Sequence, residues 1–441
     1  NMFSPEFFIK AGQLLLSLSI LIALHELGHF IPARIFGCRV EKFYLFFDVK
    51  YSLFKKKIGE TVYGIGWLPL GGYVKISGMI DESFDKEQMQ KPPKPWEFRS
   101  KPAWQRLIIM LGGVTVNLLL GFLIYMMVLF VWGKETLPQE NIPLGLEPSA
   151  FIQEIGFDKG DKIIEVDGEE LDFVLDINRM LLLRPVDKVK VEKIDGSISE
   201  INIPDNIGNE IFQSGQISSF TPIFSATIDS VFNDSPALYA GMQSGDVIVS
   251  VNGQSIYDWS DFSNWIGNNT DDLIDVEVER GNSIYKLNID RNDDGTIGVV
   301  RRNEIRTINK KLGLFESIVQ GFNYGYWTLY EYVAGFSFVF TKKGASQLGG
   351  FGTIGNIFPA KWDWKGFWLS TALISIILAF MNVLPIPALD GGHVMFLIYE
   401  MVSGRKPSDR FMEVSTMIGF FILIAIVLYA NGNDIVRAFA N

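Results

Sequence analysis

Residues 14–32 of this chain read LLLSLSILIALHELGHFIP, an apolar stretch interrupted by one short polar motif. The motif places His25 and His29 four residues apart, with Glu26 beside the first histidine. On a helix this spacing puts both imidazoles on one face, where they can share a metal ion, and leaves the carboxylate as a general base for water. Ionisable groups inside a membrane-length apolar helix are costly, so they indicate a functional site.

The composition indicates a membrane part joined to a soluble part. The 441 residues are 48% hydrophobic with a mean hydropathy of +0.20, yet 20% of them are charged. The single cysteine, Cys38, excludes an internal disulfide and a cysteine-based metal site. Only three histidines are present, and two of them belong to the motif, which argues against a chance match.

Four apolar stretches are long enough to cross a bilayer, which requires roughly 20 residues each. They cover residues 7–34, 104–132, 367–390 and 411–430, and the third is most apolar from Phe367 to Leu384. The first has no small-residue cleavage site after its apolar part, so we expect a retained span and not a signal peptide. The sequence predicts a polytopic α-helical membrane protein with four transmembrane helices.

The distribution of charge predicts the side of the membrane on which each connection lies. Residues 34–103 carry about 13 Lys or Arg against 8 Asp or Glu, and the link between the last two spans is also basic. By the positive-inside rule both connections are cytoplasmic, and segment 134–310 lies on the other side. That segment holds about 32 acidic against 15 basic residues, which argues against nucleic-acid binding.

Segment 134–310 contains an internal repeat. Residues 157–171, FDKGDKIIEVDGEEL, match residues 242–256, MQSGDVIVSVNGQSI, at an offset of 85. Each copy reads as a Gly-Asp turn, a β-branched strand and an Asp-Gly or Asn-Gly hairpin turn. The pattern resembles the PDZ domain, and we place two inserted α+β domains at 134–220 and 221–305. Such domains bind an extended peptide at a sheet edge, although a spacer or plug role is an equal alternative.

Two further segments are expected to contact the lipid bilayer. Residues 306–364 include an apolar, aromatic stretch, 312–345, whose charges favour an interfacial amphipathic helix over a span. Residues 61–80 belong to the N-terminal membrane region, 1–133, and are apolar, rich in β-formers and punctuated by glycine. They predict β-strands on the cytoplasmic connection.

A second polar position lies in the C-terminal membrane region, 365–441. Residues 381–393 read MNVLPIPALDGGH, and Asp390 is the only acidic residue between positions 364 and 399. Prolines remove backbone donors and glycines permit sharp turns, so we expect Asp390 on irregular backbone at membrane depth. A buried carboxylate needs a cation, and a zinc ion shared with His25 and His29 would supply it. The alternative is a carboxylate that only caps a helix.

Together these features resemble the site-2 protease family of intramembrane zinc peptidases, in particular its bacterial regulator of sigma-E type. The resemblance rests on HELGH in the first span, NVLPIPALDGGH in a later one and the paired PDZ-like domains. It implies Zn²⁺ held by His25, His29 and Asp390, with Glu26 activating water. It also implies cleavage of single-pass membrane proteins, such as anti-sigma factors or remnant signal peptides, after another protease has trimmed them.

The resemblance further implies an inner-membrane location, with the PDZ-like domains extracytoplasmic and the zinc site toward the cytoplasm. It also implies that residues 61–80 form a cytoplasmic, membrane-associated β-hairpin. Asn382 would hold substrate backbone or an oxyanion, and Gly71, Gly72 and Tyr73 would offer a strand edge to an unwound substrate helix. The alternatives are a structural amide at Asn382 and a hairpin that simply lies on the protein. His393 is a competing ligand candidate, more often a structural histidine.

Several roles stay open at this point. Gly112, Gly113 and Asn117 in the second span favour close helix packing, with catalysis by Asn117 as the lesser alternative. Glu26 has the alternative of a helix-face charge paired with a basic residue. Two rival functions are a membrane-anchored PDZ scaffold with a structural or vestigial zinc site, and a transporter that relays protons through His and Asp.

Overall fold

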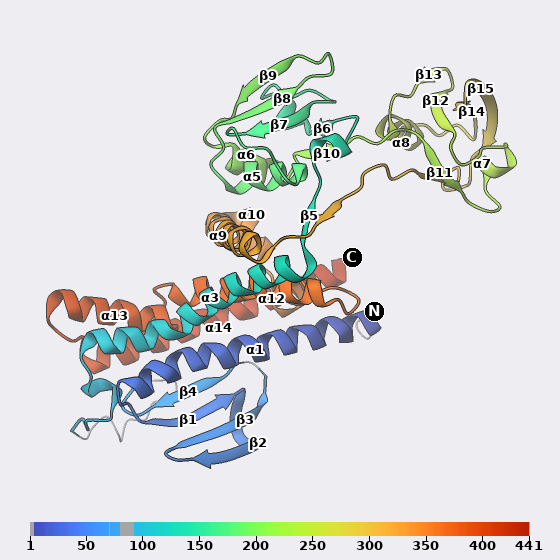
Figure 1. The fold of residues 1–441 in the computed structure, drawn as a ribbon. Helices are drawn as coiled ribbons and strands as arrows, with labels where there is room; N and C mark the ends of the chain where they lie inside the picture. The colour runs from blue at the N-terminus through green and yellow to red at the C-terminus, as the bar shows by residue number, and fades with distance from the viewer. Residues whose placement is uncertain (1–3, 70, 80–91, 441) are drawn as a thin grey trace. The chain divides into compact units, whose positions relative to one another are not determined.

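The protein is described by a computed structural model that covers residues 4–69, 71–79 and 92–440. The chain divides into two compact units, one formed by residues 1–133 and 311–441 and the other by residues 134–310. The first unit holds the long helices and a small sheet, and the second holds two β-rich domains (Figure 1).

Four helices among the described residues are long and apolar enough to cross a membrane, as predicted. They are α1 (Pro5–Ile35), α3 (Ala103–Trp132), α12 (Trp364–Val383) and α14 (Asp409–Ala440). Side-chain caps stabilise the N-termini of two of these helices. Ser4 accepts a hydrogen bond from the Phe7 N–H at 3.3 Å, and Asp363 accepts one from the Gly366 N–H at 2.7 Å.

The third of these helices is shorter than the predicted 367–390. α12 ends at Val383 because Pro385 and Pro387 cannot continue the hydrogen-bond pattern of a helix. Irregular backbone follows over residues 384–389. A separate helix, α13 (Asp390–Ser403), then begins at Asp390 itself. The carboxylate therefore stands at a break between two helices.

The segment after residue 310 begins with α9 (Leu314–Phe336), which packs on α3 through two glycines. A β-carbon on Gly321 would lie 2.6 Å from Met126 Cα, and one on Gly325 would lie 3.0 Å from the Phe122 ring. In Figure 1 α9 is seen nearly end-on, whereas α3 and α12 run across the view. Three short helices follow: η4 (Ser337–Phe340), α10 (Lys342–Gln347) and α11 (Phe351–Gly355). The interfacial position of this segment stays a prediction.

A four-stranded sheet follows α1 and replaces the predicted hairpin over residues 61–80. Its strands are β1 (Val40–Leu45), β2 (Phe47–Ile58), β3 (Thr61–Leu68) and β4 (Tyr73–Ile76), in the order β2-β3-β1-β4. The hairpin prediction is wrong because β1 lies between β3 and β4, parallel to β3 and antiparallel to β4. β3 instead forms its hairpin with β2. Residues 70 and 80 lie outside the described residues.

The second unit contains two repeat domains, each with its own apolar core. The first core is formed by buried residues between Leu137 and Phe220, and the second by buried residues between Ala226 and Ile297. The first domain comprises β6 (Leu146–Pro148), α4 (Ala150–Gln153), β7 (Lys162–Val166), α5 (Ile177–Leu183), β8 (Lys188–Glu192), β9 (Ile198–Asn202), α6 (Ile207–Ser214) and β10 (Phe220–Pro222). The second comprises β11 (Ile228–Val231), α7 (Pro236–Tyr239), β12 (Val247–Val251), β13 (Gln254–Ser255), α8 (Trp259–Asn268), β14 (Leu273–Arg280), β15 (Ser283–Asp290) and β16 (Val299–Arg301). β5 (Lys134–Thr136) and β17 (Ile308–Lys310) pair where the unit begins and ends.

The sequence repeat recurs in the strands. β7, β8 and β9 begin 85 residues before β12, β14 and β15, respectively. The turn after β7 has positive φ at Asp167 (53°) and Gly168 (85°), and the turn after β12 has positive φ at Asn252 (48°) and Gly253 (78°). Positive φ at both central residues is the type I′ turn that Asp-Gly and Asn-Gly favour. The predicted hairpin turns are therefore confirmed.

Candidate active site

The two motif histidines lie on one face of α1, as their spacing predicts. Their Nε2 atoms are 3.2 Å apart, and the rings meet edge to face with centroids 4.8 Å apart. Both side chains are largely buried. Two imidazole nitrogens on an apolar helix therefore point at the same small region of space beside it.

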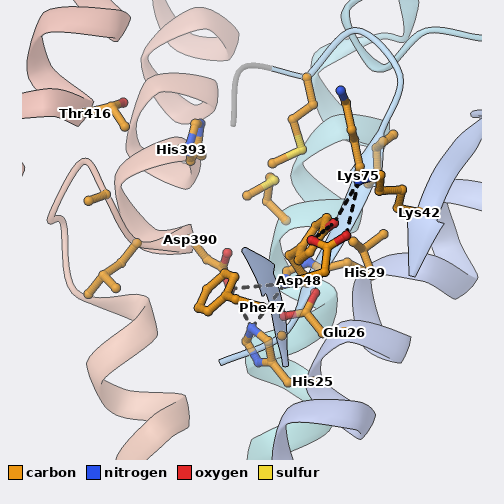
Figure 2. Close-up of a pocket in the computed structure, with 18 residues that line it drawn as sticks. His25, Glu26, His29, Lys42, Phe47, Asp48, Lys75, Asp390, His393 and Thr416 are labelled. Atoms are coloured by element: carbon orange, nitrogen blue, oxygen red, sulfur yellow. Dashed lines mark hydrogen bonds and ion pairs between the residues drawn. The ribbon is translucent and has the colours of Figure 1, made fainter. Parts of the chain in front are cut away.

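Asp390 reaches the same region from the first turn of α13. Its Oδ2 lies 3.3 Å from Nε2 of His25 and 3.3 Å from Nε2 of His29 (Figure 2). In the described part of the chain these three residues form the only group that could hold a metal ion, and their ligand atoms lie within 4.8 Å of one another. His393, the competing candidate, lies one turn further along α13 and is not in this group.

The arrangement fits zinc. Tetrahedral zinc with bonds of about 2.0–2.2 Å keeps its ligand atoms roughly 3.3–3.6 Å apart, and the separations here are 3.2 and 3.3 Å. Two imidazoles and one carboxylate make up the three-ligand set of a catalytic site, which leaves one coordination position open. Asp390 Oδ2 is buried and, among the described residues, has no well-formed hydrogen bond beyond its 3.3 Å contacts with the two imidazoles, an arrangement that a bound cation would satisfy.

Glu26 lines the cavity beside this group. The backbone N–H of Val74 in β4 hydrogen-bonds to its carboxylate. Gly72 lies close by, since a β-carbon there would lie 3.5 Å from Glu26 Cγ. Among the described residues no ion pair joins Glu26 to a lysine or arginine. The carboxylate thus belongs to the site and not to a surface charge pair.

A cavity of about 490 Å³ lies over these groups. Its walls come from α1, β4, α13 and Thr416 of α14 (Figure 2). On the sheet side, the Tyr73 hydroxyl donates to Asp48 Oδ1 at 2.8 Å, and Lys42 Nζ donates to the same hydroxyl at 3.2 Å. β4 is an edge strand of its sheet. A strand edge and a polar cluster therefore border the carboxylate and the imidazoles.

The predicted substrate-binding residues divide into two groups. Gly72 and Tyr73 line the cavity, and Gly71 lies against Phe47, whose ring would be 2.8 Å from a β-carbon there. Asn382 is half-buried in the last turn of α12 and is not among the described residues that line the cavity. The structure therefore brings the glycine-tyrosine segment to the site and leaves Asn382 apart from the cavity.

Sequence reasoning missed two residues at the site and gave a third mainly a packing role. Lys42 and Asp48 lie in a connection with many charges, so nothing in the local pattern distinguishes them. Asn117, assigned mainly to packing, lies with its Nδ2 3.1 Å from His25 Nδ1. The feature of the sequence that could have indicated this role is the position of Asn117, four residues after Gly113 on the helix that packs against α1.

Two histidines and a glutamate on a membrane-length apolar helix, facing an aspartate at the start of a second, shorter helix, form the kind of site expected of a membrane metallopeptidase. The model of peptidase family M50 matches residues 13–426, and the chain belongs to this family, the site-2 proteases. It is 27% identical to a regulator of sigma E protease from Haemophilus influenzae, over 98% of this chain and 100% of that protein. It is 28% identical to a putative zinc metalloprotease from Campylobacter jejuni, over 96% and 92% of the two chains.

A third relative is the protease RseP from Yersinia pestis, 28% identical over 96% of this chain and 97% of its own. Family membership and the apolar helices together make the chain a multi-pass membrane metalloendopeptidase of the site-2 protease type. The expected enzyme class is therefore confirmed.

Proposed function

We propose that this protein cleaves transmembrane segments of single-pass membrane proteins, such as anti-sigma factors or remnant signal peptides, in regulated intramembrane proteolysis. The observation that carries the proposal is the buried cluster of His25, His29 and Asp390 within apolar helices, with Glu26 beside it. A site for water-soluble peptides gains nothing from burial at membrane depth, where ionisable groups are costly.

Different residues of the chain would bind the metal and transfer protons during peptide hydrolysis. Zinc, when bound, acts as a Lewis acid that polarises the scissile carbonyl and makes water a stronger nucleophile. His25, His29 and Asp390 would hold it in a fixed position. Glu26 would take a proton from the attacking water and pass it to the leaving nitrogen. The break before Asp390 lets a carboxylate from one helix meet imidazoles from another.

β4 is suited to hold the substrate next to Glu26. A substrate helix cannot be cut while its carbonyl groups are bonded within the helix, so it must first unwind into an extended chain. The freed backbone groups then need partners, which an edge strand provides. β4 lines the cavity with Tyr73 and Val74, and Val74 contacts Glu26. An extended segment beside β4 would therefore place its peptide bonds at the catalytic carboxylate.

The charge bias supports an inner-membrane protein with the zinc site toward the cytoplasm and residues 134–310 on the extracytoplasmic side. There the two PDZ-like domains would screen substrates by size or by a newly exposed C-terminus, after another protease has trimmed them.

Two of the relatives carry names that refer to the regulation of sigma E or to RseP, which supports anti-sigma factors as substrates. Deleting 134–310 should allow cleavage of untrimmed substrates, and unchanged selectivity would argue against screening.

Glu26→Gln tests the chemistry. The amide keeps the size of the side chain but cannot accept the proton, so zinc content should be unchanged while cleavage falls about 10²–10⁴-fold. The assay uses purified protein in detergent with a trimmed single-pass substrate, with and without a zinc chelator. Glu6→Gln, an exposed carboxylate on the same helix paired with Lys10, is the matched control and should cleave normally.

The rival functions predict different results in the same assay. A PDZ scaffold with a structural zinc site would bind zinc and cleave nothing even as wild type. A proton-relaying transporter would hold no zinc. If the glutamine variant cleaves at the wild-type rate, Glu26 is not the base and the proposed chemistry fails.

A further inference from the structure

One face of α3 contacts both metal-binding histidines. The backbone carbonyl of Ile109 lies 2.8 Å from His29 Nδ1, and the Asn117 amide lies 3.1 Å from His25 Nδ1. Gly113 stands halfway between them, and the intervals of four residues place all three on one stripe of the helix. A β-carbon on Gly113 would lie 2.4 Å from His29 Nε2 and 2.6 Å from His25 Cε1. Only glycine lets the rings approach α3 this closely.

The geometry fixes which nitrogen of each ring binds the metal. The two Nε2 atoms and Asp390 Oδ2 face one another at 3.2 and 3.3 Å, so Nε2 is the ligand atom in both rings. In a neutral imidazole the other nitrogen then carries the proton and must donate it. His29 Nδ1 donates to the Ile109 carbonyl. His25 Nδ1 needs an acceptor of the same kind.

Asn117 can supply that acceptor. Its side chain is almost fully buried, and its amide oxygen has no hydrogen-bond partner among the described residues, while its nitrogen faces His25. The oxygen and nitrogen of an amide are assigned from the hydrogen bonds they make. A half-turn about the last side-chain bond puts the oxygen opposite His25 Nδ1–H. That single change gives the ring its acceptor and gives the buried oxygen its donor.

We infer that Asn117 is the positioning residue of His25, holding the ring through its amide oxygen so that Nε2 points at the metal. The inference rests on the zinc site of the proposed function. Partners of this kind fix the tautomer and ring orientation of a ligand, and their removal typically lowers metal affinity about 10–100-fold. α3 would then act as a template that orients one histidine by a backbone carbonyl and the other by a side chain.

Zinc affinity of the full-length purified protein is the readout, measured by competition with a chelator. Asn117→Leu keeps the volume and removes the acceptor, Asn117→Ala removes it without adding bulk, and Asn117→Asp keeps an oxygen at the same place. Ser375→Ala is the matched control, because the Ser375 hydroxyl donates to the Asn117 backbone carbonyl at 2.6 Å and does not depend on its amide. Substitution with Co²⁺ adds a visible spectrum that reports the ligand geometry directly.

The Leu and Ala variants should bind zinc about 10–100-fold more weakly and show altered Co²⁺ bands, whereas the Asp and Ser375→Ala variants should stay near wild type. Folding is checked by thermal unfolding without metal, and the Ala variant decides the outcome if the Leu variant does not fold. Wild-type affinity in a folded Leu or Ala variant, or an equal loss in the Asp variant, overturns the inference. If wild type itself binds no zinc, it is the proposed zinc site that fails.

Discussion

Gly28 of α1 and Gly112 of α3 are in direct backbone contact at the turn that carries the histidines. A β-carbon on Gly28 would lie 2.4 Å from the Gly112 carbonyl oxygen, and one on Gly112 would lie 1.9 Å from the Gly28 carbonyl oxygen. Because both obstacles are backbone atoms, neither can move aside unless the helices separate. Small residues allow such close crossings in membranes. The contact therefore sets the distance from His29 to the Ile109 carbonyl.

Gly112→Ala should force α1 and α3 apart and weaken both the fold and the metal site. We expect a loss of about 1–3 kcal/mol in the free energy of unfolding and a lower zinc affinity, because His29 moves away from the Ile109 carbonyl. Thermal unfolding and chelator competition on the purified protein measure the two effects. Gly12→Ala on α1, the partner helix in this crossing, is the control, since a β-carbon there meets nothing within 4 Å. Normal zinc binding by Gly112→Ala would show that the close crossing is dispensable.

Gly72→Ala should reduce cleavage while leaving zinc in place. Its β-carbon would lie 2.6 Å from Ile22 Cγ2 and 2.7 Å from the Tyr44 carbonyl oxygen, so β4 must shift away from α1 and Glu26. A misplacement of about 1 Å can cost about 10²-fold in rate. The value of kcat/KM on a trimmed substrate, beside zinc content, checks this. A parallel loss of zinc would mean that the strand supports the metal site and not only the substrate.

The part of the site that lies on one helix was predictable, because helix periodicity alone places His25 and His29 together. Asp390 is distant in the sequence, and it was found through the chemical cost of a buried carboxylate. The contact between Asn117 and His25 could not be found in this way. It depends on how closely α1 and α3 cross, which is set by a glycine pair on two different helices.

The strand order shows the same limit. The local pattern of residues 61–80 is that of two β-favouring runs around a glycine-rich turn, and it correctly predicts strands. Nothing in that local pattern indicates that β1, earlier in the chain, lies between β3 and β4. Pairing between distant strands is decided by the whole sheet. In the repeat domains, by contrast, each hairpin turn is local, and Asp-Gly and Asn-Gly were sufficient to predict it.

Arg280→Met should destabilise the second repeat domain. The fully buried Asp246 carboxylate accepts hydrogen bonds from Arg280 Nε at 2.6 Å and Nη2 at 2.8 Å. Removing the arginine leaves the buried carboxylate with no cation and, among the described residues, only the Gln243 N–H as a donor, at 2.9 Å. Because Arg280 is itself partly exposed, we expect a loss of about 1–3 kcal/mol. Amide hydrogen exchange in β12 and β14 of the full chain measures the loss.

Lys286→Met is the control for this change. Lys286 pairs with Asp275 at 3.3 Å between neighbouring strands of the same domain, but both side chains are exposed. Exposed pairs contribute about 0–1 kcal/mol, so exchange should hardly change. Equal effects of the two substitutions would mean that burial of Asp246 does not matter.

The contact between Lys159 and Asp258 should be lost in acid. Lys159, in the first repeat domain, lies 2.6 Å from Asp258, the residue that caps α8 in the second. Burial alone would raise the pKa of Asp258, but hydrogen bonds from Lys159, Ser260 and the Asp261 N–H outweigh it and hold that pKa below its ordinary 3.8. A carboxylate with a lowered pKa stabilises the fold above its ordinary value and loses this effect as the pH falls through the lowered one.

We therefore expect the contact to be constant from neutral pH to about pH 4 and to weaken below it. Distances between spin labels on β9 and β15, measured across this range, test the expectation. Lys159→Met should loosen the two domains at neutral pH and move the acid transition to higher pH, because Asp258 then keeps only its cap hydrogen bonds. An identical pH profile in the variant would mean that another group controls the transition, since the lysine is the only cation that contacts Asp258 among the described residues.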